Sequence, residues 1–252
     1  MSRFALAVAS LLLIAACATH LPQTPPAGMP ATVSAPELRA GGYWRFAVSD
    51  GFTRLARGTI EYRVDTIDAD TVTVHVTTAA GESTELYTRD WNWLRRPATN
   101  MQVFDYSPAY RAFDFPLAAG RKWSFRGTAR DPADGRTFPV RIDGEVLGWE
   151  RVKVPAGEFE TLRVRRYVTL DYWLQGVRGP SEIMETDWYA PALNQVVRRE
   201  TTSRYLRLAD ASPMFVRVRG GGGRGRDSDG DRLPRYEQDD WLVYELIAQG
   251  RR

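Results

Sequence analysis

The chain has 252 residues, a formal net charge of +3 and a pI of about 9.1. This weak positive charge does not favour a polyanionic partner, so we expect no nucleic-acid binding, and a single cysteine excludes internal disulfides. Only Lys122 and Lys153 are lysines, so 32 of the 34 basic residues are arginine. That bias indicates either bidentate recognition of carboxylate or phosphate groups, or a GC-rich genome with many arginine codons.

Residues 1–16 have the layout of a secretory signal peptide. Arg3 supplies a positive charge, and residues 4–16 follow as an uncharged, mostly apolar stretch. At about 1.5 Å per residue, a helix of that length spans roughly 20 Å, less than the roughly 30 Å of a bilayer core. We therefore expect a cleaved leader rather than a membrane span.

Cys17 directly follows this leader. The tetrapeptide Ile14-Ala15-Ala16-Cys17 resembles a bacterial lipobox, which implies that Cys17 is lipidated and becomes the mature N-terminus. Ala18 follows where, by resemblance to the enterobacterial sorting rule, aspartate would signal retention in the inner membrane. The resemblance therefore implies a lipoprotein held by fatty-acyl chains such as palmitate at the periplasmic face of the outer membrane. The alternatives are general secretory cleavage that leaves a free thiol, and a chance cysteine in the leader.

Residues 17–40 are rich in proline and poor in large apolar side chains. Proline lacks the backbone donor that helices and sheets need, and such a composition cannot bury a core. We expect a disordered, semi-extended linker between Cys17 and a folded domain at 41–252. At about 3.1 Å per residue, the linker would reach on the order of 60 Å.

Alternation of apolar and polar residues dominates the domain at 41–252. Val72, Val74 and Val76, for example, are separated by threonine and His75, as a half-buried strand requires. The predicted strands are 43–49, 58–66, 70–78, 83–89, 122–129, 159–169, 182–189, 195–208 and 241–248.

Short turns separate these strands, with Gly81, Gly135 and Gly157 at positions where a turn needs conformational freedom. Strands joined by short turns pair antiparallel, because a parallel crossover needs a dozen or more residues. We therefore predict an all-β, mainly antiparallel domain. Its meander sheet has to curl into an open barrel or fold into a sandwich to protect its edges.

A Gly-rich stretch at 220–232 is predicted to be a disordered surface loop within this domain. Three aspartates at alternate positions have the spacing of a calcium loop; they are Asp227, Asp229 and Asp231. However, Arg232 and Arg235 stand where that pattern requires glycine and an acid, and their charges oppose a bound cation. A solvated loop is the preferred interpretation, and we expect no metal site.

The sequence gives no positive sign of catalysis. His75 is the histidine available within the domain for a Ser-His-acid triad, and no G-x-S-x-G motif accompanies it. A structural histidine on a strand is the preferred interpretation. The 31 acidic residues include no pattern that marks a glycosidase pair. We therefore expect a protein without enzyme activity or cofactor.

Two stretches resemble a family of uncharacterised proteobacterial lipoproteins and periplasmic proteins. Residues 148–159, GWERVKVPAGEF, match its G-x-E-x-V-x-V-P-A-G-x-F hairpin, and residues 186–200 contain its W-Y-A-P and V-V-R-x-E strands. The resemblance covers about residues 115–205. It implies an all-β fold and no established reaction.

The aromatic residues form either a ligand-binding groove or ordinary core. The candidates for a groove are Trp91, Trp93, Trp149, Trp173, Trp188 and Tyr189. We expect a non-catalytic envelope binding or assembly module, attached to the membrane by its lipid, with a lipid or an envelope protein as partner. The alternative, by likeness to open-barrel lipoprotein-sorting proteins, is a carrier or receptor for lipid or lipoprotein. A wide apolar cavity would favour the carrier.

Overall fold

The computed structural model describes residues 21–98, 103–174, 177–208 and 235–252. Within these ranges the secondary structure consists of twelve strands and one short 3-10 helix. Their bounds are β1 (Gly42–Asp50), β2 (Ala56–Ile67), β3 (Thr71–Thr78), β4 (Gly81–Thr88), β5 (Trp93–Pro97), β6 (Val103–Tyr110), β7 (Lys122–Arg130), β8 (Thr137–Val154), β9 (Gly157–Leu174), β10 (Val177–Ala190), η1 (Pro191–Leu193), β11 (Gln195–Leu208) and β12 (Arg235–Arg251).

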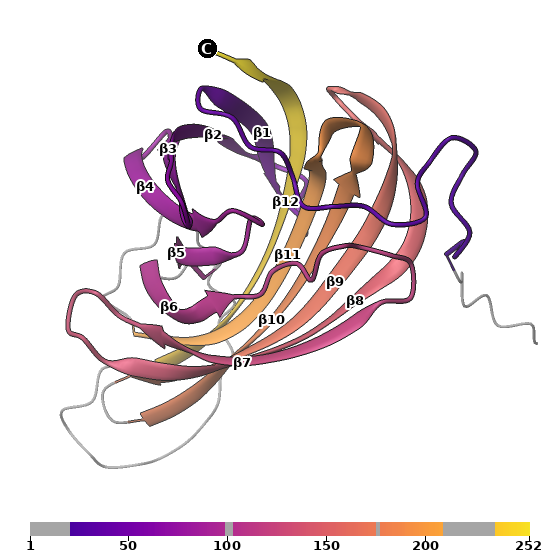
Figure 1. Cartoon of the computed structure of the whole chain (residues 1–252). Coiled ribbons are helices and arrows are strands. Elements are labelled where there is room, and N and C mark those ends of the chain that lie inside the picture. Colours follow the sequence, from indigo (N-terminus) through magenta and orange to yellow (C-terminus); the bar gives the residue numbers. More distant parts are fainter. Residues whose placement is uncertain (1–20, 99–102, 175–176, 209–234) are drawn as a thin grey trace, which may run out of the picture.

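The strands form one closed antiparallel barrel. Each strand pairs with its neighbour in sequence, and β12 returns to pair with both β11 and β1. Long, curved strands β8 to β11 make up one side, and the shorter strands β3 to β6 face them (Figure 1). The predicted all-β, antiparallel fold is confirmed. The sheet closes fully, rather than staying open or splitting into a sandwich, because β12 covers the edge that β1 would expose.

Local sequence explains most of the barrel. Val72, Val74 and Val76 of β3 point into the core, while the residues between them face outward. The predicted turns also form, and Gly81 and Gly157 adopt φ values of +139° and +142°, which L-residues with a side chain avoid. Three strands are missing from the prediction. β5 is short and irregularly paired, and β6 contains Pro108. β8 is also missing, although its residues 137–146 alternate between buried and more exposed positions.

Residues 21–40, here called the N-terminal strap, lie against the barrel, so the predicted disordered linker is wrong for this segment. The backbone N–H of Trp149 donates to the Pro22 carbonyl at 2.8 Å, and Val33 and Leu117 exchange two backbone hydrogen bonds of 2.8 Å. Val33 is only 4% exposed. Prolines cannot donate hydrogen bonds, but their carbonyls still accept them, and a small apolar side chain is enough to anchor the strap.

The docked strap shortens the expected tether. Four peptide links separate Cys17 from Leu21, where the described chain begins. Fully extended, they span at most about 14 Å. The expected reach of about 60 Å therefore does not hold.

The barrel interior is filled with side chains rather than hollow. Its large buried residues include Tyr87, Phe104, Phe113, Phe138 and Tyr189. In the part of the chain that the structure describes, no helix has the length and apolar character needed to cross a bilayer.

A substitution at Val33 tests whether the strap is docked. Val33→Asp places a charge in an apolar contact and is expected to release the strap, because burying a valine contributes roughly 1.5–3 kcal/mol and an unpaired charge cannot be buried there. Hydrogen–deuterium exchange should show slow exchange at Val33 and Leu117 in the wild type and fast exchange in the variant. Thr32→Asp, at an exposed neighbouring position, should change nothing. Exchange that is equally fast in the wild type would contradict docking and support the predicted disordered linker.

Candidate functional site

Adjacent arginines on three strands reveal the polar interior of the barrel. Side chains alternate across a strand, so one member of each pair has to face inward. The second arginine does so in every pair. The side-chain exposures are 43% for Arg95 and 12% for Arg96, 33% for Arg165 and 0% for Arg166, and 25% for Arg198 and 12% for Arg199.

Arg166 is enclosed completely, and the protein supplies partners for all three of its side-chain nitrogens. Nε donates to Glu185 at 2.8 Å, and the two terminal nitrogens donate to the Ala112 carbonyl at 3.0 Å and to Asp187 at 2.6 Å. The guanidinium carbon also lies 5.2 Å from the centre of the Phe113 ring. A buried charge is tolerated only with such complete pairing.

Asp187 joins Arg166 to Arg199. Its two carboxylate oxygens accept from Arg199 at 2.6 and 3.0 Å, and one of them also accepts from Arg166. Burial alone would raise the pKa of Asp187, but the positive charges of Arg199 and Arg166 outweigh burial and lower the pKa to about 2. Asp187 is therefore ionised across the physiological range.

Two tyrosines donate hydrogen bonds to the buried carboxylates of Glu185 and Glu85. Tyr110 donates to Glu185 at 3.0 Å, and Tyr87 donates to Glu85. Burial raises the pKa of both tyrosines well above the ordinary value, so their hydroxyl groups remain protonated and act as donors.

Arg96 lies on the other side of the interior, on β5. Its Nε is 3.4 Å from Glu85, and a terminal nitrogen donates to the Tyr62 hydroxyl at 3.3 Å. Its guanidinium carbon lies 4.4 Å from the centre of the Trp93 ring. Burial acts to lower the pKa of Arg96, but the acidic groups around it, including Glu85, outweigh burial and hold the pKa well above the usual range. Arg96 is therefore a permanent cation.

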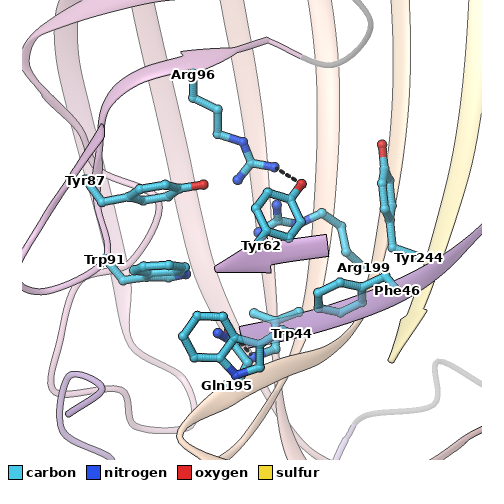
Figure 2. Close-up of a pocket in the computed structure, with 10 residues that line it drawn as sticks. Trp44, Phe46, Tyr62, Tyr87, Trp91, Arg96, Gln195, Arg199 and Tyr244 are labelled. Carbon is cyan, nitrogen blue, oxygen red and sulfur yellow. Dashed lines mark hydrogen bonds between the residues drawn. The ribbon is translucent and has the colours of Figure 1, made fainter. Parts of the chain in front are cut away.

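Arg96 and Arg199 line a pocket in the barrel whose walls are aromatic (Figure 2). The cavity has a volume of about 30 Å³. Figure 2 shows Tyr87 and Trp91 on one side, Phe46 and Tyr244 on the other, and Trp44 with Gln195 below. The complete lining is Trp44, Phe46, Tyr62, Tyr87, Trp91, Arg96, Gln195, Val196, Arg199 and Tyr244.

Trp91 reaches the pocket from a constrained turn between β4 and β5. Its backbone adopts a φ of +65°, a left-handed conformation that bulky residues rarely occupy. The turn is held by hydrogen bonds from Trp91 N–H to the Thr88 carbonyl at 3.0 Å and from Thr88 N–H to the Asn92 carbonyl at 2.8 Å. The Trp91 ring then stacks on Tyr87, with ring centres 4.2 Å apart and planes 10° apart. Strain of this kind concentrates at functional sites.

The five described members of the predicted aromatic groove do not share one surface, because their side chains point to different places. Trp91 lines the pocket, whereas Trp93 lies deeper in the barrel and stacks on Tyr110 with ring centres 4.1 Å apart. Tyr189 also faces inward and packs against Phe113 with ring centres 5.9 Å apart. The side chain of Trp173 lies outside the described residues.

Trp149 and Trp188 complete this comparison. Trp149 is buried in the core. Trp188 lies on the outer wall, where the guanidinium carbons of Arg163 and Arg198 each sit 5.0 Å from its ring and its indole N–H donates to Glu150 at 2.8 Å. Both residues therefore have packing roles away from the pocket.

Sequence reasoning missed the arginines and most of the aromatic wall of the pocket. The available signal was the repeated Arg-Arg dipeptide within predicted or neighbouring strands, since strand alternation turns one arginine of each pair inward.

The described structure gives no support to a catalytic triad at His75 or to a metal site. His75 lies on the outer face of β3 with Nε2 3.4 Å from Glu82, and in the described ranges no serine hydroxyl hydrogen-bonds to it. Those ranges also contain no group of three or more histidine, cysteine or acidic residues arranged to hold a metal ion. Cys17 and the calcium-like residues, Asp227, Asp229 and Asp231, lie outside the described residues.

No protein-family model matches this chain, and neither does any curated protein. Among solved structures, it is similar to a protein from Bacteroides fragilis described as exported, with a YmcC-like fold, at 14% identity and a TM-score of 0.46, covering 87% of this chain and 100% of that one. A protein described as a lipoprotein from Parabacteroides distasonis gives 14% identity and a TM-score of 0.46, with 88% and 100% coverage. The hypothetical lipoprotein YmcC from Escherichia coli gives 9% identity and a TM-score of 0.42, with 82% and 84% coverage. Similarities this low carry no argument about this chain.

Acid titration tests the role of Asp187. Its pKa is about 2 in the folded protein and about 3.9 in an unfolded chain, so its contribution to stability is complete above about pH 4 and is lost as the pH falls towards 2. The loss should amount to roughly 2–3 kcal/mol in the free energy of unfolding measured with urea.

The variant Asp187→Asn should lower the free energy of unfolding at neutral pH by roughly 3–5 kcal/mol, because two arginines lose a buried counter-charge. It should also remove this part of the pH dependence. Asp143→Asn, which breaks a surface pair with Arg141, should cost at most about 1 kcal/mol. Equal losses in the two variants would contradict the buried pairing.

Proposed function

We propose that this protein is a lipid-anchored envelope protein whose barrel is a non-catalytic binding or assembly module. Lipidated Cys17 holds the mature chain at the periplasmic face of the outer membrane. The signal-peptide layout of residues 1–16 and the lipobox-like tetrapeptide support the anchor. If Cys17 is lipidated, at most about 14 Å of extended chain separates it from Leu21 of the docked strap, which supports a position of the barrel close to the membrane surface.

The pocket lined by Arg96 and Arg199 is the observation that carries the binding function. It combines aromatic walls with a few positioned charged groups, which is the usual composition of a ligand site. The carboxylates beside these arginines already serve as ion-pair partners, Glu85 for Arg96 and Asp187 for Arg199. That use of the acidic groups favours binding over acid–base catalysis.

Binding near the pocket opening is favoured over carriage of an acyl chain. The pocket lined by Arg96 and Arg199 measures about 30 Å³ and a neighbouring one beside Trp93 about 10 Å³, whereas sites for whole organic ligands occupy roughly 300–1,000 Å³. A larger hollow of about 600 Å³ crosses β9 to β12, but its lining includes Glu182, Arg204 and Asp239. Its lining mixes these charged residues with apolar ones such as Phe52 and Ile183, so it is not the uniformly apolar cavity that an acyl chain favours.

Fractionation of cells that express the full-length protein tests the anchor. Cys17→Ser removes the lipid acceptor and is expected to move the protein from the membrane to the soluble periplasmic fraction. Ala18→Ser keeps the cysteine and should leave the protein in the outer membrane. Ala18→Asp should shift it towards the inner membrane in an enterobacterial host. Full membrane retention of Cys17→Ser would refute lipid anchoring.

Native mass spectrometry of the purified full-length protein separates the binding functions. A small ligand retained by the wild type and lost on pocket substitution supports a binding module. Acyl lipids retained independently of the pocket would instead favour the carrier alternative.

A further inference from the structure

The two arginines of the pocket have unused hydrogen-bonding capacity. A guanidinium group carries five N–H donors. Arg166 engages all three of its nitrogens, but Arg199 uses only Nε and one terminal nitrogen, both on Asp187. Arg96 donates one hydrogen bond, to Tyr62, and contacts Glu85 through Nε. Among the described residues, no acceptor pairs with the second terminal nitrogen of Arg96 or Arg199.

Both guanidinium groups are held beside the same ring. Their central carbons lie 4.4 Å and 5.8 Å from the centre of the Trp93 ring. Burial and the charge of Arg96 both act to lower the pKa of Arg199, and Asp187 outweighs them, so the pKa of Arg199 remains raised. Glu85 and Asp187 compensate most of the two charges, but Arg96 and Arg199 still repel each other across the pocket. An anion placed between them would relieve this repulsion and accept charge-assisted hydrogen bonds from both.

The size of the pocket limits what can enter. A cavity of about 30 Å³ has room for about two waters and is comparable to one small anionic group. Arg96 and Arg199 remain 12% exposed, so solvent reaches their charges. The remainder of a ligand would have to stay at the opening, beside the half-buried Trp44 and Tyr244.

The wall near the opening is aromatic, and the planes of the Trp44 and Trp91 rings meet there at an angle of 61°. Trp91 stacks on Tyr87, and Trp44 meets Trp91 edge to face with ring centres 5.6 Å apart. Such a surface packs well against a planar ring, because aromatic groups favour offset-stacked and edge-to-face contacts.

We infer that the pocket binds the carboxylate or phosphate group of a ligand between Arg96 and Arg199, with a planar ring of the ligand against Trp44 and Trp91. The inference rests on the proposed binding function and names the chemical class of its ligand. It also assigns a role to part of the arginine excess, namely recognition of an anion by inward-facing guanidinium groups.

Calorimetric titration of the purified full-length protein tests the inference with defined probes. Phenyl phosphate and benzoate represent the two sources of the anionic group, and benzyl alcohol is the uncharged control. We expect saturable binding of at least one anionic probe and none of benzyl alcohol. Inorganic phosphate should bind more weakly than phenyl phosphate because it lacks the ring. Preference between phenyl phosphate and benzoate identifies the source of the anion.

Substitution of the pocket arginines tests whether the probes bind in the pocket. Arg96→Gln and Arg199→Gln should each lower the affinity for the preferred probe by about tenfold or more, because each variant loses a charged hydrogen bond. Arg95→Gln is the matched control, because Arg95 is the outward neighbour of Arg96 and pairs with Asp105 on the surface. It should leave affinity unchanged.

Trp44→Ala is a second test in case an arginine variant fails to fold. Trp44 is half-buried at the opening, so its replacement should disturb folding less than loss of a buried ion pair. This variant should bind phenyl phosphate more weakly than the wild type and should bind inorganic phosphate with unchanged affinity. No saturable binding of any anionic probe, or binding unaffected by all pocket variants, would overturn the inference. If native mass spectrometry then showed a neutral ligand lost on pocket substitution, the binding function would stand and only the anionic class would fail.

Discussion

The organisation of the barrel depends on pairing charges away from water. Closing the sheet turns every second residue of each strand inward, and among the side chains that the structure describes Arg96, Arg166 and Arg199 face inward. Arg166 has no exposed side-chain surface, so its charge is stable only beside Glu185 and Asp187. Removing two ions from water costs several kcal/mol each, and their attraction offsets that cost only with good geometry and satisfied hydrogen bonds. The buried pairs therefore specify how the strands fit together more surely than they add stability.

Asp187 extends this constraint from the core to the pocket. It binds Arg166 on one side and Arg199 on the other, so the orientation of Arg199 follows from the position of the fully buried arginine. Arg96 is positioned independently by Glu85 and by the face of Trp93. Asp187 thus orients the guanidinium group of Arg199, and Glu85 and Trp93 orient that of Arg96, towards one aromatic pocket. A site arranged in this way binds with little loss of side-chain freedom, because its charged groups are already ordered.

The fold was largely predictable because strands and turns have local signatures. The alternation in β3 and the turn at Gly157 depend on neighbours in sequence, and both formed as expected. The pocket was not predictable, because Arg96 pairs with Tyr62, which is 34 residues away, and five-residue β5 is too short to show a period. Docking of the strap was not predictable for the same reason, because no local signal shows that Pro22 contacts Trp149. The doubled arginines did indicate inward-facing charge, but their partners follow only from closure of the barrel.

Chemical modification of arginine tests the inward orientation most directly. The native full-length protein would be treated with a dicarbonyl reagent that attacks accessible guanidinium groups, and the modified residues would be mapped by mass spectrometry. We expect modification of Arg95, Arg165 and Arg198, whose side chains are 43%, 33% and 25% exposed, and protection of Arg166 until the protein unfolds. Modification of Arg166 in the folded protein as fast as that of Arg165 would contradict the buried network.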